Sequence, residues 1–190
     1  MDTDADLTRT LVIVEGASDR LALEVLARRL GRNLAADGVS IVPIGGAHSI
    51  GRFLAGLDRR GSRLRLAGLC DVGEEGAFQR AVEQAGLGAG LTRDGMERLG
   101  FYVCDADLED ELIRALGVAE VEKVIEDLGD LQSLRSFQRQ PFQRERPPEA
   151  QLRRFMGTRS GRKAKYAQAL VGALDLARIP RPLELLLARL

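Results

Sequence analysis

The chain lacks several residue types and patterns that define particular classes of protein. It contains no tryptophan, one histidine and two cysteines, which argues against a zinc site built from histidine and cysteine ligands. No apolar run approaches the roughly 20 residues that a membrane-spanning helix needs. The acidic N-terminus, MDTDADLTRT, has neither the basic nor the apolar part of a secretory signal. These absences predict a cytoplasmic protein that does not contact membranes.

Two further absences argue against particular ways of binding nucleotides and nucleic acids. No G-x-x-x-x-G-K-[ST] sequence occurs, so the chain has no P-loop ATPase site of its own. Aromatic residues make up 4%, which argues against a platform on which several bases stack. Cys70 and Cys104 each end an apolar stretch, where a buried thiol is more typical than a disulfide or a metal ligand.

The formal net charge of zero hides an uneven distribution of charged residues. Residues 1–130 contain 15 Lys and Arg against 24 Asp and Glu, a net charge of −9. Residues 131–190 contain 13 against 4, a net charge of +9. An ordinary solvated surface rarely separates charge by segment in this way. The distribution predicts acidic chemistry in the first part and a basic binding surface in the second.

The order of apolar segments predicts an α/β fold. Short apolar stretches typical of strands occur at residues 11–14, 39–44, 64–70 and 101–104, and helical patterns follow the first three. Strands and helices that alternate at this spacing form a parallel sheet with helices on both faces. From residue 107 onward the pattern is helical. We therefore predict one domain at residues 8–130 and a basic helical extension at residues 131–190 packed on it.

Acidic residues stand where ligands bind in an open parallel sheet, at the carboxyl ends of the strands. Glu15, Asp71 and Asp105 follow or end three of the predicted strands. The same crevice could receive four more acids: Asp19, Asp107, Glu109 and Glu111. One such acid is usually a helix cap or a partner of the helix dipole. Several together need a cation, and carboxylate oxygens favour Mg²⁺ or Mn²⁺.

Three segments together resemble a known family. VEGASD after the first strand, LCDVGEE at a later strand end, and GFYVCDADLEDELIRALG followed by MGTRSGRKAKYAQAL are similar to the TOPRIM domain of the OLD (overcoming lysogenization defect) nucleases. TOPRIM domains also occur in topoisomerases and bacterial primases. The resemblance covers nearly the whole chain. It implies a Rossmann-like TOPRIM fold and a Mg²⁺-dependent endonuclease or nickase that hydrolyses DNA through two metal ions.

The resemblance also implies roles for single acidic residues. Glu15 would be a metal ligand or general base, and Asp19 would be the second acid of its motif. Asp71 would be the first Asp of a DxD signature, whose second position is Gly73 here, although two glutamates follow immediately. The remaining metal ligands would be Asp107, Glu109 and Glu111.

Basic residues after position 130 are candidates for contacts with phosphates. Lysine is rare in the chain, and Lys163 in RSGRK matches the lysine of OLD nucleases that stabilises charge in the transition state. An ordinary surface lysine is the alternative interpretation. The predicted contacts with the nucleic-acid backbone, which would not read sequence, are Arg153, Arg154, Arg159, Arg162 and Lys165.

Glycines follow each of the first two predicted strands. Gly16 allows the chain to turn tightly after Glu15. Gly45 and Gly46 either present backbone N–H groups to a phosphate or form an ordinary turn. The sequence leaves both interpretations open.

Several functional questions stay open at this stage. OLD-family proteins usually carry an ATPase domain before TOPRIM, so ATP dependence would require a separate ATPase partner or a longer parent chain. Gly73 favours a second interpretation, a non-catalytic nucleic-acid-binding or regulatory module. A third is primase-type nucleotidyl transfer; topoisomerase chemistry would need a nucleophilic tyrosine from an attached domain. A homodimer is a further expectation.

Overall fold

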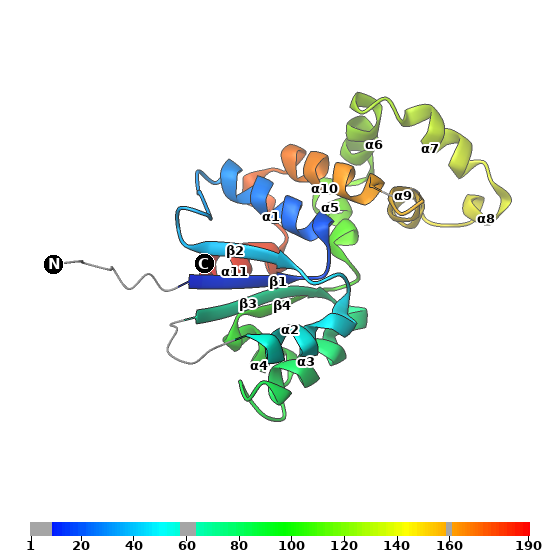
Figure 1. The fold of residues 1–190 in the computed structure, drawn as a ribbon. Helices are drawn as coiled ribbons and strands as arrows, with labels where there is room; N and C mark the ends of the chain where they lie inside the picture. The colour runs from blue at the N-terminus through cyan, green and yellow to red at the C-terminus, as the bar shows by residue number, and fades with distance from the viewer. Residues whose placement is uncertain (1–8, 58–63, 159–160) are drawn as a thin grey trace.

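A computed structural model, which describes residues 9–57, 64–158 and 161–190, has a four-stranded sheet at its centre (Figure 1). In chain order the strands are β1 (Arg9–Val14), β2 (Val39–Pro43), β3 (Leu64–Asp71) and β4 (Phe101–Cys104). They lie in the order β2-β1-β3-β4, and every neighbouring pair is parallel. The predicted α/β fold with a parallel four-stranded sheet is confirmed.

The strands are almost continuously apolar because both faces of the sheet are covered. In β1, Val12 and Val14 belong to the hydrophobic cluster on one face, whereas Ile13 belongs to the cluster on the other. This alternation follows from the two-residue period of a strand. A parallel sheet covered on both sides buries both sets of side chains.

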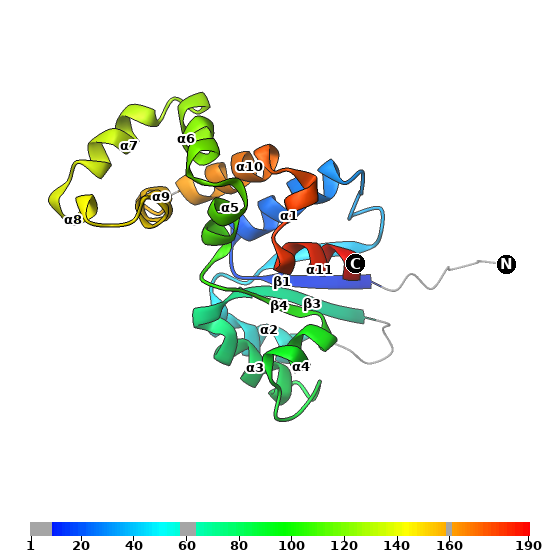
Figure 2. The same ribbon diagram turned by 180° about the vertical axis from the view of Figure 1, so that it is seen from behind.

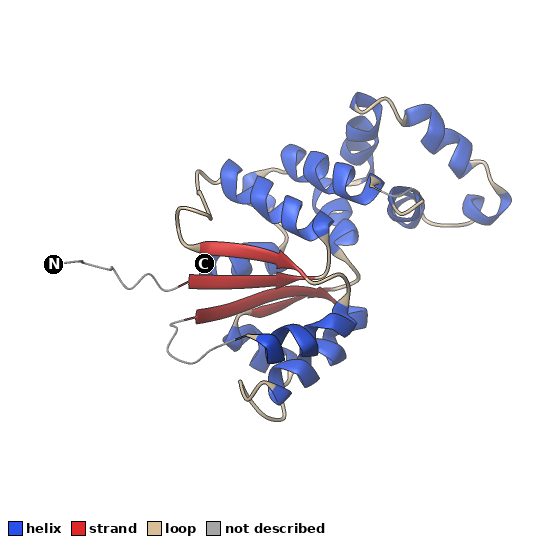
Figure 3. Ribbon diagram, in the orientation of Figure 1, coloured by secondary structure: helices blue, strands red, loops and turns tan. Residues whose placement is uncertain are grey.

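Helices form one layer on each face of the sheet (Figure 3). One layer contains α2 (Ile50–Gly56), α3 (Glu75–Gln84) and α4 (Arg93–Leu99). The other contains α1 (Ala17–Arg29), α5 (Leu108–Leu116), α10 (Arg162–Ala173) and α11 (Arg181–Arg189). Three short 3₁₀ helices complete the described elements of the sheet region: η1 (Ala47–Ser49), η2 (Val72–Glu74) and η3 (Leu176–Arg178).

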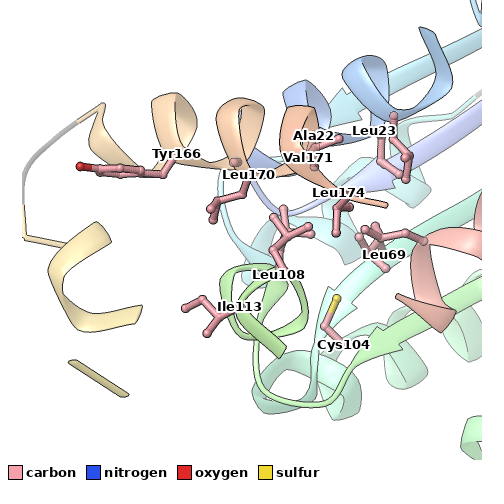
Figure 4. Packing of buried hydrophobic residues seen from close by; sticks show 14 of the residues in the cluster. Ala22, Leu23, Leu69, Cys104, Leu108, Ile113, Tyr166, Leu170, Val171 and Leu174 are labelled. Carbon is pink, nitrogen blue, oxygen red and sulfur yellow. The ribbon is translucent and has the colours of Figure 1, made fainter. Parts of the chain in front are cut away.

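The second layer joins segments that are distant in sequence. Figure 4 shows its core, in which Leu170 of α10 and Leu174, the residue after this helix, lie with Leu108 of α5 and Leu69 of β3. Arg29 at the end of α1 ties the layer together, because its Nη1 donates to two carbonyl oxygens at the end of α10, both at 2.7 Å. The packing of α10 on α1 and α5 brings the basic C-terminal part of the chain to the carboxyl edge of the sheet.

The remaining helices project away from the sheet (Figures 1 and 2). They are α6 (Val118–Asp127), α7 (Leu131–Gln138), α8 (Pro141–Arg144) and α9 (Pro148–Met156). We call α7, α8 and α9, residues 131–156, the arm. Proline occupies the first position of both α8 and α9, where its missing N–H costs no helical hydrogen bond. Phe137 and Phe155, whose ring centroids are 5.6 Å apart, hold α7 against α9.

Helix α4 is the element that the sequence analysis did not predict. Its seven residues, RDGMERL, include only two large apolar side chains, too few for a helical period, so its signals are its caps. The Thr92 side chain accepts the backbone N–H of Gly95 at 3.2 Å, and Gly100 ends the helix with φ of 95°. A left-handed residue at this position favours glycine.

Across the part of the chain that the structure describes, no helix combines the length and the apolar character needed to cross a membrane.

Candidate metal centre

A cleft of about 310 Å³ lies at the carboxyl edge of the sheet, beyond the ends of β1 and β3. Its walls come from the two residues after β1, from α1, from the turn after β2, and from β3, α5 and α10. The lining residues are Glu15, Gly16, Ser18, Asp19, Gly45, Gly46, Asp71, Glu109 and Lys163. Five of the residues predicted to form a catalytic or metal site therefore meet there: Glu15, Asp19, Asp71, Glu109 and Lys163.

The turn after β2 fixes the backbone of Glu15. The N–H groups of Gly45 and Gly46 donate to the Glu15 carbonyl oxygen at 3.0 and 3.1 Å. Both glycines have positive φ, 72° and 109°, which side chains of other residues rarely tolerate. Since these N–H groups already have an acceptor, the two glycines form a turn that positions Glu15 and do not present free donors to a phosphate.

Asp19 is held at the start of α1. Its Oδ2 accepts the backbone N–H of Gly16 at 2.8 Å, which caps the first turn of the helix. Burial raises the pKa of Asp19 to about 6, and the nearby charges of Glu109 and Glu15 add to this effect against the opposing hydrogen bond. Asp19 is therefore both a helix cap and part of an acidic group of side chains.

Asp71 and Glu15 show that negative charge accumulates in the cleft. Burial, followed by the charge of Glu15, raises the pKa of Asp71 to about 7. Burial, followed by the charge of Glu74, raises the pKa of Glu15. Each carboxylate makes its neighbour harder to ionise, as expected for like charges in a partly desolvated site. A bound cation would reverse this effect.

Lys163 is the basic side chain among the residues that line the cleft. Its Nζ donates to Oε2 of Glu109 at 3.2 Å, across 54 positions of sequence. Desolvation lowers the pKa of Lys163, but the charge and the hydrogen bond of Glu109 outweigh it and raise the pKa overall. Lys163 therefore carries a positive charge beside the acidic group.

The donor atoms of the cleft fit a hard divalent cation. Oε2 of Glu15 and Oε1 of Glu109 are buried and have no hydrogen-bond partner, so each needs a cation or a proton. Carboxylate oxygens are the preferred ligands of Mg²⁺ and Mn²⁺. Within residues 9–57, 64–158 and 161–190, however, no three His, Cys, Asp or Glu side chains already surround one point that could hold an ion. Ion binding would have to draw the carboxylates together.

Asp107 lies beside the cleft but has other partners. Its Oδ1 accepts the backbone N–H of Asp110 at 2.8 Å and so caps α5. Its Oδ2 accepts Nε of Arg153 at 2.7 Å. The charge of Asp107 still contributes to the raised pKa of Asp71. Asp107 thus affects the cleft electrostatically while serving as a cap, and Arg153 is paired with a carboxylate at the rim.

Glu111 and Asp105 interact with residues outside the cleft. Glu111 accepts the backbone N–H of Asp105 at 2.9 Å and forms an ion pair with Arg114 at 2.8 Å. The Asp105 side chain is 67% exposed and pairs with Arg93 and Arg114. Neither acid lines the cleft. The expectation that both would join the acidic group therefore differs from their observed positions. Glu111 points in another direction than Glu109 because both belong to α5, and Asp105 lies in the connection before that helix with its side chain largely in solvent.

The basic residues predicted to contact phosphates divide into exposed and buried ones. Arg154 is exposed on α9, and Lys165 is half-exposed, with Nζ 3.4 Å from Oδ2 of Asp130. Arg162 is 8% exposed, and its guanidinium lies 4.3 Å from the centre of the Phe155 ring, so it is part of the interior. Arg159 lies outside the described residues.

Glu74 is an acid that the predicted ligand set did not include. It follows Gly73, the position where the DxD signature has its second Asp, and it belongs to η2 after β3. After burial, its charge has the largest effect on the raised pKa of Glu15. The carboxylate of Glu74 therefore lies near Glu15, where the second Asp of a DxD signature would be expected to act. The pair of glutamates in LCDVGEE was the sequence feature that could have indicated this.

A parallel sheet with carboxylates at its carboxyl edge has the architecture of a TOPRIM domain, and comparisons with known proteins agree. Residues 7–71 match the family model described as overcoming lysogenization defect protein-like, TOPRIM domain. The chain is similar to the C-terminal region of the Burkholderia pseudomallei OLD protein, with a TM-score of 0.70 and 21% identity over 95% of this chain and 96% of that one.

A second solved structure gives the same result. The C-terminal region of the Xanthomonas campestris pv. campestris OLD protein has a TM-score of 0.70 and 20% identity, over 95% of this chain and 91% of that one. No curated protein matches the chain in sequence. The resemblance to the OLD TOPRIM domain is thus confirmed, by sequence for residues 7–71 and by fold for nearly the whole chain. The chain is consistent with a nuclease-type TOPRIM module, and TOPRIM domains generally bind divalent metals.

Proposed function

We propose that the chain is a Mg²⁺- or Mn²⁺-dependent endonuclease or nickase that hydrolyses DNA phosphodiesters. The observation that supports this most directly is the meeting of Glu15, Asp71 and Glu109 with Lys163 in one cleft. Hydrolysis of a phosphodiester needs an activated water and a means to neutralise charge on the phosphate. Carboxylates that hold cations, beside a fixed ammonium group, meet both requirements.

The carboxylates that would hold the metal are the four that line the cleft: Glu15, Asp19, Asp71 and Glu109. Burial raises the pKa of the first three, and the charge of Asp107 adds to this effect at Glu15 and Asp71. When bound, one or two ions would supply an activated water and charge neutralisation at the scissile phosphate. Glu15, fixed through its carbonyl oxygen, is also the proposed general base. Glu111 is a weaker candidate because its carboxylate is already paired.

Lys163 has the position expected of a group that stabilises developing negative charge. Its ammonium group lies 3.2 Å from Glu109 and remains half-exposed at the cleft, so it can also reach a phosphate oxygen. A positioned cation in a partly desolvated site stabilises a transition state more than it would in water. The pair with Glu109 keeps the side chain in place before substrate binds.

The DNA partner is proposed from charge and position. The exposed basic side chains of Arg154 and Lys165, together with Arg153 at the rim and Arg159, would contact the phosphate backbone without reading sequence. A separate ATPase partner, a homodimer and a cytoplasmic location remain part of the proposal.

A non-catalytic module that binds nucleic acid is the second candidate function. It is favoured by Gly73 in the DxD position and by the fact that the described side chains do not already surround an ion position. Such a module would keep the fold and the basic surface without turnover. Cleavage assays separate the two candidates.

The test of the proposed function is nicking of supercoiled plasmid by the purified chain. We expect relaxed or linear product with Mg²⁺ or Mn²⁺ and none with EDTA. Ca²⁺, which binds carboxylates with a looser geometry, is expected to support DNA binding with little cleavage. Binding of Mg²⁺ or Mn²⁺ without any cleavage would instead support the regulatory module.

Thermal unfolding should reveal the metal site independently of activity. Because the pKa values of Asp19 and Asp71 are raised in the folded state to about 6 and about 7, their contribution to stability is present below pH 4 and is lost as the pH rises to 7. Millimolar Mg²⁺ or Mn²⁺ should therefore raise the melting temperature by about 5–10 °C at pH 8, and much less at pH 5.

The Asp71→Asn variant is the control for this effect. Without metal it should melt at a higher temperature than the unsubstituted chain at pH 8 but not at pH 4, since only the ionised carboxylate is unfavourable. It should also gain less from the ion at pH 8. An equal gain from Mg²⁺ at both pH values in the unsubstituted chain would contradict the assignment of these carboxylates.

A further inference from the structure

The short helix α8 and the residues on either side of it, 139–146, form a segment that we call the tip of the arm. One aromatic side chain of the tip is unusually exposed. Phe142 in α8 is 87% exposed, whereas Phe78, Phe101 and Phe155 are 2% exposed or less. An exposed single apolar residue alone would not indicate a function. Its surroundings, however, are held by several hydrogen bonds and contain three arginines against one acid, Glu145.

A buried glutamine of α9 holds the tip in place. Nε2 of Gln151 donates to the carbonyl oxygens of Gln143 at 2.8 Å and Arg146 at 2.9 Å, on either side of the end of α8. The Gln143 side chain is 5% exposed, so the short helix is anchored by one residue while the preceding one faces solvent. Phe142 is therefore presented on a braced turn, which lowers the entropy lost when it contacts a ligand.

Three arginines surround Phe142 in sequence: Arg139, Arg144 and Arg146. Nε of Arg144 donates to the carbonyl oxygen of Arg139 at 2.8 Å, and Nε of Arg146 donates to the carbonyl oxygen of Phe142 at 3.1 Å. In the described part of the chain, no ion pair with a carboxylate involves any of the three. Their guanidinium groups are thus oriented by neutral acceptors and keep their full charge for an anionic partner.

We propose that this tip binds single-stranded nucleic acid, with Phe142 stacked on an unpaired base and the three arginines on the flanking phosphates. Aromatic rings that contact bases, beside cations that contact phosphates, are the two components of single-strand binding. The low aromatic content argues against a platform on which several bases stack. The proposed contact needs a single aromatic ring, that of Phe142. The inference rests on the proposed function, because the tip would bind the same nucleic acid that the cleft is proposed to cut.

Other partners fit the tip less well. A protein-binding surface would need a contiguous apolar patch, and Phe142 is the exposed large hydrophobic residue of the arm among those described. Insertion of the ring into an intact duplex would require two stacked base pairs to separate, which costs stacking energy. An unpaired base carries no such cost, so a single-stranded segment is favoured.

The position of the arm connects the tip with the cleft. Arg153, in the last turn of α9, pairs with Asp107 at the rim of the cleft, whereas the first turn of α9 follows α8 after three residues. The nine residues of α9 span about 13 Å between the rim of the cleft and the segment that leads to α8. A strand that leaves the cleft along α9 would therefore run toward Phe142.

The absence of tryptophan from the chain allows a direct test, because the Phe142→Trp variant contains a single fluorophore at the tip. In EDTA, where no cleavage occurs, its emission should be quenched saturably by an oligothymidylate of about 20 nucleotides, since a 4–16-nucleotide site fits within that length. A Leu176→Trp variant, with its fluorophore on η3 at a site 38% exposed, is the matched control and should not respond.

Affinity measurements complete the test. Phe142→Ala should weaken binding of the same oligonucleotide by about 5- to 100-fold, the loss expected for one stacked base, and should change affinity for blunt duplex less than about twofold. No quenching, quenching by anionic lipid vesicles alone, or equal losses for duplex and single strand would overturn the inference. If the tip responds but the chain never cuts DNA, only the nuclease proposal fails; if the chain cuts but the tip does not respond, only this inference fails.

Discussion

Replacing Glu15 with Gln, or Asp71 with Asn, is expected to reduce nicking of supercoiled plasmid by roughly 10³-fold or more, the loss expected when several kcal/mol of metal-dependent stabilisation disappear. Each substitution keeps the shape of the side chain but removes the charge that would hold a cation. The fold should persist, because both carboxylates are already unfavourable in the metal-free protein, as their raised pKa values show. Duplex affinity should stay the same or rise, since a negative charge near the phosphates is lost.

Nicking and calorimetric metal binding should be measured on the same preparations. Glu120→Gln is the matched control, because it removes a carboxylate on α6 that is 44% exposed and pairs only with Lys123 in the described structure. It should leave both activities unchanged. A Glu15→Gln protein that cuts as fast as the unsubstituted chain would show that the carboxylates of the cleft do not form the metal centre.

Lys163→Ala should lower turnover by roughly 10²-fold or more, by analogy with the loss of one preorganised donor to a transition state. Metal binding should survive this change, in contrast to the two acid substitutions. It should even become tighter, because Glu109 loses the ammonium group that now pairs with it at 3.2 Å and its carboxylate is released for a cation. The Michaelis constant for DNA should change much less than the turnover number.

The control for this prediction is Lys123→Ala. Lys123 lies on α6, is 65% exposed and pairs with Glu120, so its loss removes the same charge away from the cleft. Turnover of this variant should remain within about twofold of the unsubstituted chain, as is usual for weak surface pairs. If Lys163→Ala loses metal binding together with turnover, the lysine supports the structure of the site and does not act on the substrate.

Much of the fold followed from local patterns. The apolar stretches that precede Glu15, Asp71 and Asp105 became β1, β3 and β4, since the period of burial in a strand depends mainly on its own residues. The placement of Glu15 and Asp71 in one cleft followed in turn, because parallel strands end at the same edge. Helix α4 was not predicted because only two of its seven residues have large apolar side chains, so that caps such as Thr92 are the main signal.

The acids after β4 show where local patterns stop being sufficient. Asp107, Glu109 and Glu111 lie within five residues, and sequence alone treats them alike. In the structure Glu109 faces the cleft, Asp107 caps α5, and Glu111 pairs with Arg114. Successive helical residues differ in direction by about 100°, so the rotation of α5 on the sheet decides which acid can serve as a ligand.

The sequence by itself determined the α/β architecture, the resemblance to OLD TOPRIM domains and the acids at the ends of β1 and β3, because these depend on short segments and on the direction of parallel strands. Only the tertiary structure decided that Lys163 meets Glu109 while its neighbour Arg162 is buried against Phe155, and that Phe142 is exposed on a braced tip. These outcomes depend on how helices distant in sequence pack together. That packing is set by the combined burial of many apolar side chains, which no single segment contains.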